Sequence, residues 1–162
     1  CNILSKHTRQ LTSIQMIDVD VQRVSESDLI PVDASLQNWA QCALSEFDQA
    51  CLTIRVVDER ESADLNKRFR SREGATNVLS FRADVPPEVD SPLLGDIVIC
   101  APVVAAEAVN QEKNLQAHWA HMVIHGVLHL IGFDHQSEAD AVVMESREIE
   151  LLAGLGFPDP YN

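Results

Sequence analysis

The segment HGVLHLIGFDH, residues 125–135, holds three histidines whose spacing suits a metal ion. In a helix, His125 and His129 are four residues apart and point to the same side. Gly132 is a residue type that often ends a helix in a left-handed conformation, so the chain can turn back and bring His135 to the same point. Three imidazole ligands leave a fourth tetrahedral position for water, as in catalytic zinc sites. The spacing therefore predicts one Zn²⁺ held by these three histidines and a water molecule.

The same spacing occurs in the long zinc-protease motif H-E-x-x-H-x-x-G-x-x-H, with one difference. Gly126 stands where that motif has the glutamate that serves as general base. A zinc peptidase or amidase with this sequence would need its base elsewhere in the chain. This departure from the motif disfavours a protease.

A basic stretch precedes the histidine segment. It contains five of the twelve Lys and Arg residues of a chain whose net charge is −13, namely Lys67, Arg68, Arg70, Arg72 and Arg82. The negative total repels polyanions at long range, but screening confines charge effects to about 8–10 Å, so a locally basic surface can still hold phosphates. From charge alone, a phosphate-binding surface and an ordinary solvated face are equally good interpretations.

Hydrophobic periodicity indicates the elements that must position these residues. Short apolar or alternating runs predict four strands, at residues 13–22, 52–58, 77–81 and 95–100. Helical periodicity predicts five helices, one that begins near Asp33 and four at residues 59–70, 102–113, 117–131 and 137–153. The alternation of strands and helices predicts an α+β fold: a single domain over residues 1–162, with a mixed sheet of about four strands covered by about five helices, and the zinc site at the end of a central helix.

Local features refine these elements. Asp33, which follows Pro31, is a plausible N-cap of the first helix. In the second helix the apolar positions are Ala63, Leu65 and Phe69. A segment with three prolines, residues 84–95, is expected to be a surface connection.

Composition limits the class of protein. A chain of 162 residues with 46% hydrophobic and 23% charged residues is typical of a folded domain rather than a disordered one. Apolar runs are too short to cross a bilayer, and residues 1–10 lack the apolar core of a secretory signal. Four cysteines without paired spacing, Cys1, Cys42, Cys51 and Cys100, do not form a secreted disulfide framework. We therefore expect a cytoplasmic protein that does not bind a membrane.

Three further stretches extend the histidine segment into a resemblance to a known family. They are LNKRFRSREGATNVLSF (65–81), LLGDIVIC (93–100) and AHWAHMVIHG (117–126), and with HGVLHLIGFDH they cover most of residues 52–135. In order and spacing the chain resembles the YbeY family of metal-dependent endoribonucleases. The resemblance implies single-strand-specific RNA cleavage in the maturation of small-subunit (16S) ribosomal RNA and in ribosome quality control. The implied partners are single-stranded ribosomal RNA, the small ribosomal subunit and its assembly factors, rather than DNA.

The resemblance also implies roles for individual residues. The zinc ligands are again the three histidines, and the functionally important arginine of the family falls on Arg70. A guanidinium there would hold a phosphate oxygen and stabilise charge in the transition state, whereas an ion pair with Asp or Glu is the structural alternative. Substrate binding is predicted for the neighbouring polar residues Lys67, Arg68, Arg72, Asn77 and Ser80. Asn77, Ser80 and Thr76 equally suit the capping of a turn and a strand.

Other polar residues near the histidines in the sequence are predicted to have mainly structural roles. His121, one turn before His125, either supports the metal ligands from behind or is an ordinary buried histidine, and the second interpretation is favoured because the set of three ligands is complete without it. Asp134 either orients a ligand imidazole or faces solvent. The acidic residues of the last helix are predicted to form its exposed side: Glu138, Asp140, Glu145, Glu148 and Glu150.

The predicted mechanism is metal-assisted phosphodiester hydrolysis in which Arg70 neutralises developing charge. The general base is not evident, because Gly126 occupies its usual position. A further hypothesis treats the protein chiefly as a ribosome-assembly factor whose zinc is structural. In that case, removing the metal would unfold the helix and turn that carry the histidines.

Overall fold

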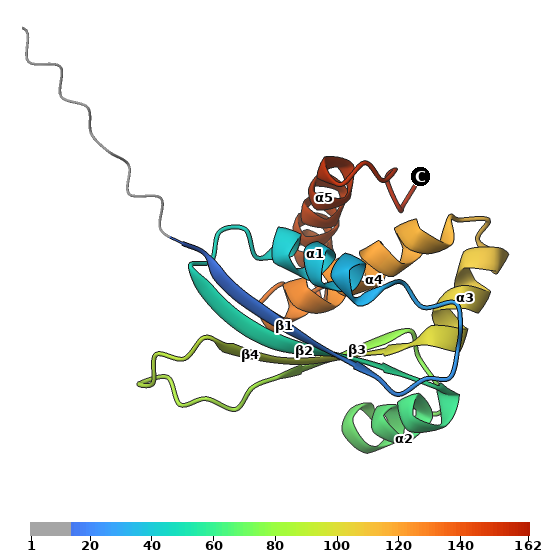
Figure 1. Cartoon of the computed structure of the whole chain (residues 1–162), viewed down its shortest axis with the longest axis horizontal. Coiled ribbons are helices and arrows are strands. Elements are labelled where there is room, and N and C mark those ends of the chain that lie inside the picture. Colours follow the sequence, from blue (N-terminus) through green and yellow to red (C-terminus); the bar gives the residue numbers. More distant parts are fainter. Residues whose placement is uncertain (1–13) are drawn as a thin grey trace, which may run out of the picture.

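The computed structural model describes residues 14–162, which fold around one four-stranded sheet with five helices (Figure 1). The strands are β1 (Met16–Arg23), β2 (Gln49–Val57), β3 (Val78–Arg82) and β4 (Leu93–Cys100). The helices are α1 (Asp33–Ala43), α2 (Glu59–Arg70), α3 (Ala101–Asn110), α4 (Leu115–Leu130) and α5 (Glu138–Gly154). The predicted α+β class is confirmed. The start of the first predicted strand, residue 13, lies outside the described residues, as do Cys1 and the stretch compared with a secretory signal.

The sheet has the order β1-β2-β4-β3. β1, β2 and β4 run parallel to one another, and β3 is antiparallel to β4 at the edge of the sheet. The parallel pairs are joined by helical crossovers, as parallel strands require. β3 and β4 are joined by the proline-containing connection, which is mostly exposed as predicted, although the last three residues of its predicted range, 93–95, belong to β4. β3 therefore has an outer side with no neighbouring strand.

The helices are distributed unequally over the two faces of the sheet. Figure 1 shows α1, α4 and α5 stacked on one side and α2 on the other, with α3 at one end. The alternation of side chains along β2 directs Leu52, Ile54 and Val56 to the larger face, where they pack with the buried residues of α4. On the α2 face, Val57 and Val98 belong to a small separate cluster. The main core therefore lies between the sheet and α4.

Helix α4 approaches the sheet closely at Gly126. A Cβ atom at this position would lie 2.9 Å from Ile97 Cγ2 and 3.2 Å from Val78 Cγ2, which is closer than ordinary contact. The Ser80 hydroxyl donates a hydrogen bond to the Gly126 carbonyl at 2.9 Å. The first carbon atom of a glutamate side chain at position 126 would already press against the sheet. The carboxylate of the protease motif is therefore replaced by a residue that α4 needs for its packing.

The predicted N-cap of α1 is wrong. The N-cap position is Val32, which makes no side-chain capping hydrogen bond, and Asp33 is the first helical residue. The Asp33 carboxylate pairs with the Arg23 guanidinium at 2.9 Å instead of bonding to the helix backbone. Its position in the first turn remains favourable because a negative charge there interacts with the helix dipole.

Helix α2 has the predicted bounds, but its predicted apolar positions are only partly correct. Phe69 is 59% exposed, while Ser62 and Asn66 are buried. These two polar side chains bind the loop that follows the helix. The Ser62 hydroxyl bonds to both the backbone N–H and the carbonyl of Thr76 at 3.0 Å, and the Asn66 amide donates to the Gly74 carbonyl at 2.9 Å. Helix α2 therefore uses its buried side to fix the loop that leads into β3.

Residues 14–162 contain no helix that is both long and apolar enough to span a membrane. The three cysteines in this part of the chain are free. Burial raises the pKa of the Cys42 and Cys100 thiols, so both behave as small apolar side chains at neutral pH.

Candidate metal centre

A helix-ending turn places the third histidine beside the first two. Gly132 has φ 110°, in the left-handed region that glycine adopts without strain. Its N–H donates to the His129 carbonyl at 3.2 Å, and the Phe133 N–H donates to the Leu128 carbonyl at 3.0 Å. This pair of bonds is a Schellman motif. The chain therefore reverses direction directly after α4, as predicted, and carries His135 back toward the helix.

The three predicted ligands converge. His125, His129 and His135 each offer a ring nitrogen, and these atoms lie within 4.8 Å of one another. The Nε2 atoms of His125 and His129 are 3.1 Å apart. The His135 ring centroid lies 5.7 Å from that of His125 and 5.0 Å from that of His129. Since His135 is exposed and the other two are half-buried, the cluster opens to the surface.

The protonation of His129 suits a metal ligand. Burial, assisted by the neighbouring His125 and His135, lowers its pKa to about 4. The imidazole is therefore neutral at pH 7, with a lone pair that a cation can accept. The donor set of three imidazole nitrogens at an open surface fits a transition metal such as zinc.

Glu148 contradicts the predicted exposed acidic side of α5, because it is 0% exposed. One carboxylate oxygen accepts a hydrogen bond from His125 Nδ1 at 2.9 Å. The other accepts from the Tyr161 hydroxyl at 2.6 Å and from His121 Nε2. Burial alone would raise the pKa of Glu148, but these hydrogen bonds outweigh it and lower the pKa to about 2. A buried carboxylate is stable here because each oxygen has a donor.

This contact fixes the tautomer of His125. An ionised carboxylate only accepts hydrogen bonds, so His125 must carry its proton on Nδ1. In the neutral form of this tautomer Nε2 carries the lone pair, and Nε2 faces His129. Histidine ligands of metals are commonly oriented by a carboxylate in this way. Asp134, the predicted candidate for this role, instead accepts a hydrogen bond from the backbone N–H of His135 at 2.7 Å.

The sequence contained a signal for Glu148 that the charge-based interpretation missed. On α5 the buried positions are Met144, Glu148, Leu151 and Leu152, which follow helical spacing. An acidic residue on the apolar side of a helix indicates a buried charge with partners. Among the other acidic residues of α5, Glu138, Asp140 and Glu150 are exposed as predicted, and Glu145 is half-buried.

The N-terminal half of α4 has a different set of contacts. His118 is buried and pairs with Glu107 of α3 at 3.2 Å. Burial lowers the pKa of His118, and Glu107 partly opposes the shift. His121 is buried as predicted, yet its partner is the carboxylate that orients His125. It therefore belongs to the network behind the metal centre.

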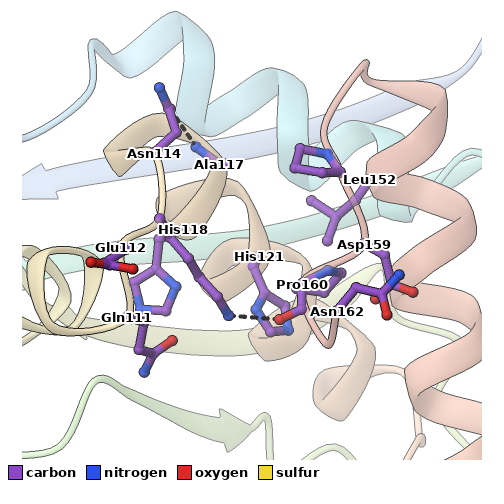
Figure 2. A pocket seen from close by; sticks show the side chains of 12 residues that line it. Gln111, Glu112, Asn114, Ala117, His118, His121, Leu152, Asp159, Pro160 and Asn162 are labelled. Carbon is purple, nitrogen blue, oxygen red and sulfur yellow. Dashed lines mark hydrogen bonds between the residues drawn. The ribbon is translucent and has the colours of Figure 1, made fainter.

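A hollow of about 330 Å³ lies beside these two histidines rather than at the three-histidine cluster. Figure 2 shows it between the start of α4 and the C-terminal segment, where Lys113 Nζ donates to the Pro160 carbonyl at 2.6 Å. Its lining combines acidic, basic and apolar residues. The hollow is not lined by His125, His129 or His135, so its size does not locate the three-histidine cluster.

Two of the predicted basic residues already have acidic partners. Lys67 pairs with Glu73 at 3.4 Å, and Arg68 pairs with Asp64 at 3.4 Å, both on the exposed surface. Such pairs contribute little to stability and exchange readily with solvent ions. They reduce the positive charge that these two side chains offer to a phosphate.

Arg70 and Arg82 lack acidic partners in the part of the chain that the structure describes, and so does Arg72. The ion-pair alternative for Arg70 is therefore not found. Arg70 Nη2 donates to the Ser80 carbonyl at 3.1 Å, and Arg82 Nε donates to the His129 carbonyl at 3.1 Å. Both guanidiniums keep further N–H groups for an anion. Arg82, which was not among the predicted site residues, contacts the backbone of a predicted metal ligand.

The polar side chains near the start of β3 are engaged within the protein. The Asn77 amide donates to the Glu107 carboxylate at 3.1 and 3.2 Å, and Asn77 Oδ1 accepts from the backbone N–H of Val78. Ser80 bonds to Gly126, as described above. These contacts hold β3 against α3 and α4, and a direct role of Asn77 and Ser80 in substrate binding stays a prediction.

Comparisons with known proteins agree with one another. The sequence model of the family described as Endoribonuclease YbeY matches residues 21–156. A protein named endoribonuclease YbeY from Nitrosococcus oceani is 53% identical over 149 residues, which cover 90% of this chain and 97% of the relative. One of the same name from Pseudomonas putida is 54% identical over 148 residues, covering 90% and 94%. The solution structure of TM1509 from Thermotoga maritima has a TM-score of 0.54 at 23% identity, covering 86% of this chain and 91% of that protein, and this likeness supports the fold alone.

Proposed function

The chain belongs to the endoribonuclease YbeY family, and on this premise we propose that it is a metal-dependent hydrolase that cuts phosphodiester bonds within RNA chains. The observation that carries the proposal is the convergence of His125, His129 and His135 at the surface end of α4. Because His125 is oriented from behind by the buried Glu148, the cluster is built to present ring nitrogens outward.

We propose zinc as the bound ion, with the three histidines as its ligands. Support comes from the imidazole donor set and from the low pKa of His129, which keeps its nitrogen available. When bound, the ion would polarise a phosphoryl oxygen and lower the pKa of a water molecule.

The arginines supply positive charge on the protein side of the reaction. Arg70 and Arg82 are held at one side by backbone carbonyls of β3 and α4, and within residues 14–162 neither is paired with a carboxylate. A guanidinium fixed in this way is ready to hold a phosphate oxygen and to stabilise the charge that develops as the bond breaks. Position 126 faces the sheet and supplies no general base.

The substrate is proposed to be unpaired RNA of the small ribosomal subunit, cut during its maturation and quality control in the cytoplasm. The resemblance of residues 52–135 to the family supports the choice of RNA and of this process. Free cysteines at positions 42, 51 and 100 fit a reducing compartment.

The test is a cleavage assay with metal-stripped and zinc-reloaded protein on unpaired RNA, duplex RNA, unpaired DNA and casein. We expect cleavage of unpaired RNA only with metal, and a loss of about 10²–10³ in rate for Arg70→Ala with the metal content unchanged. Arg60→Ala, which removes an exposed arginine from the first turn of the same helix, is the matched control and should be active.

Three outcomes would contradict the proposal. Cleavage of casein instead of RNA would identify a peptidase. Full activity of Arg70→Ala would remove this residue from the reaction. Collapse of the circular dichroism spectrum on metal removal, with no RNA cleavage by the loaded protein, would identify a structural metal.

A further inference from the structure

Phe69 presents an aromatic ring to solvent at the end of α2. It is 59% exposed, and its ring lies 5.2 Å from the Phe81 ring of β3, between centroids, with the planes at 72°. This edge-to-face contact fixes the ring between a helix and a strand. The Phe69 residue is therefore more than half exposed and yet held in place, which is the arrangement expected of a contact surface for another flat group.

The surroundings of this ring are basic in an acidic protein. The Arg68 guanidinium carbon lies 5.6 Å from the Phe69 ring centroid, and Arg70 is the next residue in the chain. The chain as a whole carries a net charge of −13, so a negatively charged partner is attracted to few places on it. An exposed ring beside the Arg70 guanidinium, which has no acidic partner within residues 14–162, fits an unpaired nucleobase with its attached phosphates. It fits an acidic peptide less well, since a peptide offers no regular series of flat rings.

Strand β3 connects this ring to the metal centre. Successive side chains of a strand point to opposite faces, so Phe81 faces α2 while Ser80 and Arg82 face α4. Ser80 bonds to Gly126, and Arg82 bonds to the carbonyl of His129. Arg70 reaches the Ser80 carbonyl from the α2 side. Since β3 is at the edge of the sheet, a chain can pass over it from one face to the other.

We propose that Phe69, held by Phe81, is a stacking platform for an unpaired base of the RNA substrate. Arg70 and Arg82 hold the adjoining phosphates where the strand crosses the outer side of β3 toward the three histidines. The identity of the substrate as RNA rests on the proposed function. The platform makes the enzyme select single strands, because the faces of paired bases in a duplex are covered by their neighbours.

The test uses the full-length, metal-loaded protein and an unpaired RNA that contains 2-aminopurine, a base whose fluorescence falls when it stacks. Wild type should bind the RNA and quench the fluorescence. Phe69→Ala should weaken binding by about 5-fold to 150-fold, the loss of one stacked base, and abolish the quenching. Phe69→Trp should keep both properties, because it restores a flat ring.

Two controls separate stacking from apolar bulk and from general damage. Phe69→Leu keeps a large apolar side chain without a π-face and should bind as weakly as Phe69→Ala. Leu29→Ala removes a similarly exposed side chain, 52% exposed in the connection between β1 and α1, and should bind as wild type does. Unchanged binding by Phe69→Ala, or wild-type binding and quenching by Phe69→Leu, would overturn the platform.

Cleavage of the same RNA is measured in parallel, so that the two proposals fail separately. If wild type cuts the RNA but Phe69→Ala binds it equally well, the platform is wrong and the proposed function stands. If wild type quenches the 2-aminopurine but cuts nothing, the proposed function is wrong and the platform describes a binding surface only. On duplex RNA, Phe69→Ala should differ little from wild type, and an equal loss on both RNAs would also overturn the platform.

Discussion

Helix α4 carries four histidines, and its two halves use them differently. In the first half each imidazole pairs with a carboxylate from another helix, His118 with Glu107 and His121 with Glu148. In the second half His125 and His129 face each other. The first half is covered by α3 and the C-terminal segment, whereas the second ends at the Gly132 turn, where the surface is open. His118 and His121 thus each direct a ring nitrogen to a carboxylate of a neighbouring helix, whereas His125 and His129 direct their Nε2 atoms to each other beside His135.

His125 belongs to both arrangements. Its Nδ1 donates to Glu148, as the histidines of the first half pair with acids, and its Nε2 lies 3.1 Å from that of His129. The buried network of the first half is thus the support of the proposed metal centre. Substitutions in each half should therefore separate binding of the metal from orientation of its ligands.

The largest effect is expected from removing a proposed ligand in the second half of α4, where the surface is open. His129→Ala should lower zinc affinity by more than the 10–100-fold that outer partners cost, and should abolish RNA cleavage. Its control is His118→Gln in the first half of α4, which is covered by other elements, and this variant should keep the metal. Metal content after dialysis and competition with a chelator measure both variants, and circular dichroism checks the fold. Equal loss of metal in the two variants would contradict the division of the helix.

A smaller effect is expected from changing Glu148, whose carboxylate is shared by His121 and His125. Glu148→Gln keeps the shape of the side chain but cannot accept from all three donors, so zinc affinity should fall by about 10–100-fold. Chelator competition measures the affinity, and the absorption spectrum of the cobalt-substituted protein should show a changed ligand geometry. Glu138→Gln, in the exposed first turn of α5, is the control. Wild-type affinity in Glu148→Gln would show that His125 needs no orienting partner.

Gly126, which lies between the two facing histidines, should affect stability more than metal binding. An added methyl group in Gly126→Ala would press on Ile97 and Val78, at a cost of about 1–3 kcal/mol that the better helix propensity of alanine offsets by about 1 kcal/mol. We expect a net loss of up to about 2 kcal/mol in the free energy of unfolding, with zinc affinity unchanged. Denaturant unfolding measures it. A more stable variant would show that the sheet relaxes around the methyl group.

The smallest effect concerns how the stability of the protein depends on pH through His118, in the first half of α4. Burial lowers the pKa of His118 below its ordinary value, against the opposing influence of Glu107, while His121 and Lys113 add to the lowering. The unfolded chain then binds the proton more readily, so this contribution to stability is complete above the unfolded pKa of about 6.5 and is lost as the pH falls below it. His118→Gln should flatten the pH dependence of the unfolding free energy between pH 7.5 and 5.5, by less than about 1.4 kcal/mol per pH unit. A parallel pH dependence in the two proteins would contradict this assignment.

The features that the sequence determined by itself depend on interactions between residues that are close together in the chain. The positions of His125 and His129 follow from the pitch of one helix, and the return of the chain toward His135 follows from the conformational freedom of Gly132. The bounds of α2 and the exposure of the proline-containing connection were predictable for the same reason. The resemblance to the family also came from contiguous motifs. In each case the deciding interactions involve residues that are near one another in the chain.

Only the tertiary structure decided which side chains meet across elements. Glu148 is buried because α5 packs it against α4, although its charge predicted exposure. Phe69 is exposed because α2 turns its polar side toward the loop before β3, although its type predicted burial. Arg82 reaches the His129 carbonyl because β3 lies at the edge of the sheet beside α4. The burial of a side chain depends on what packs against it. The order of the strands and the placement of the helices decide this packing, and neither can be predicted from hydrophobic periodicity along the chain.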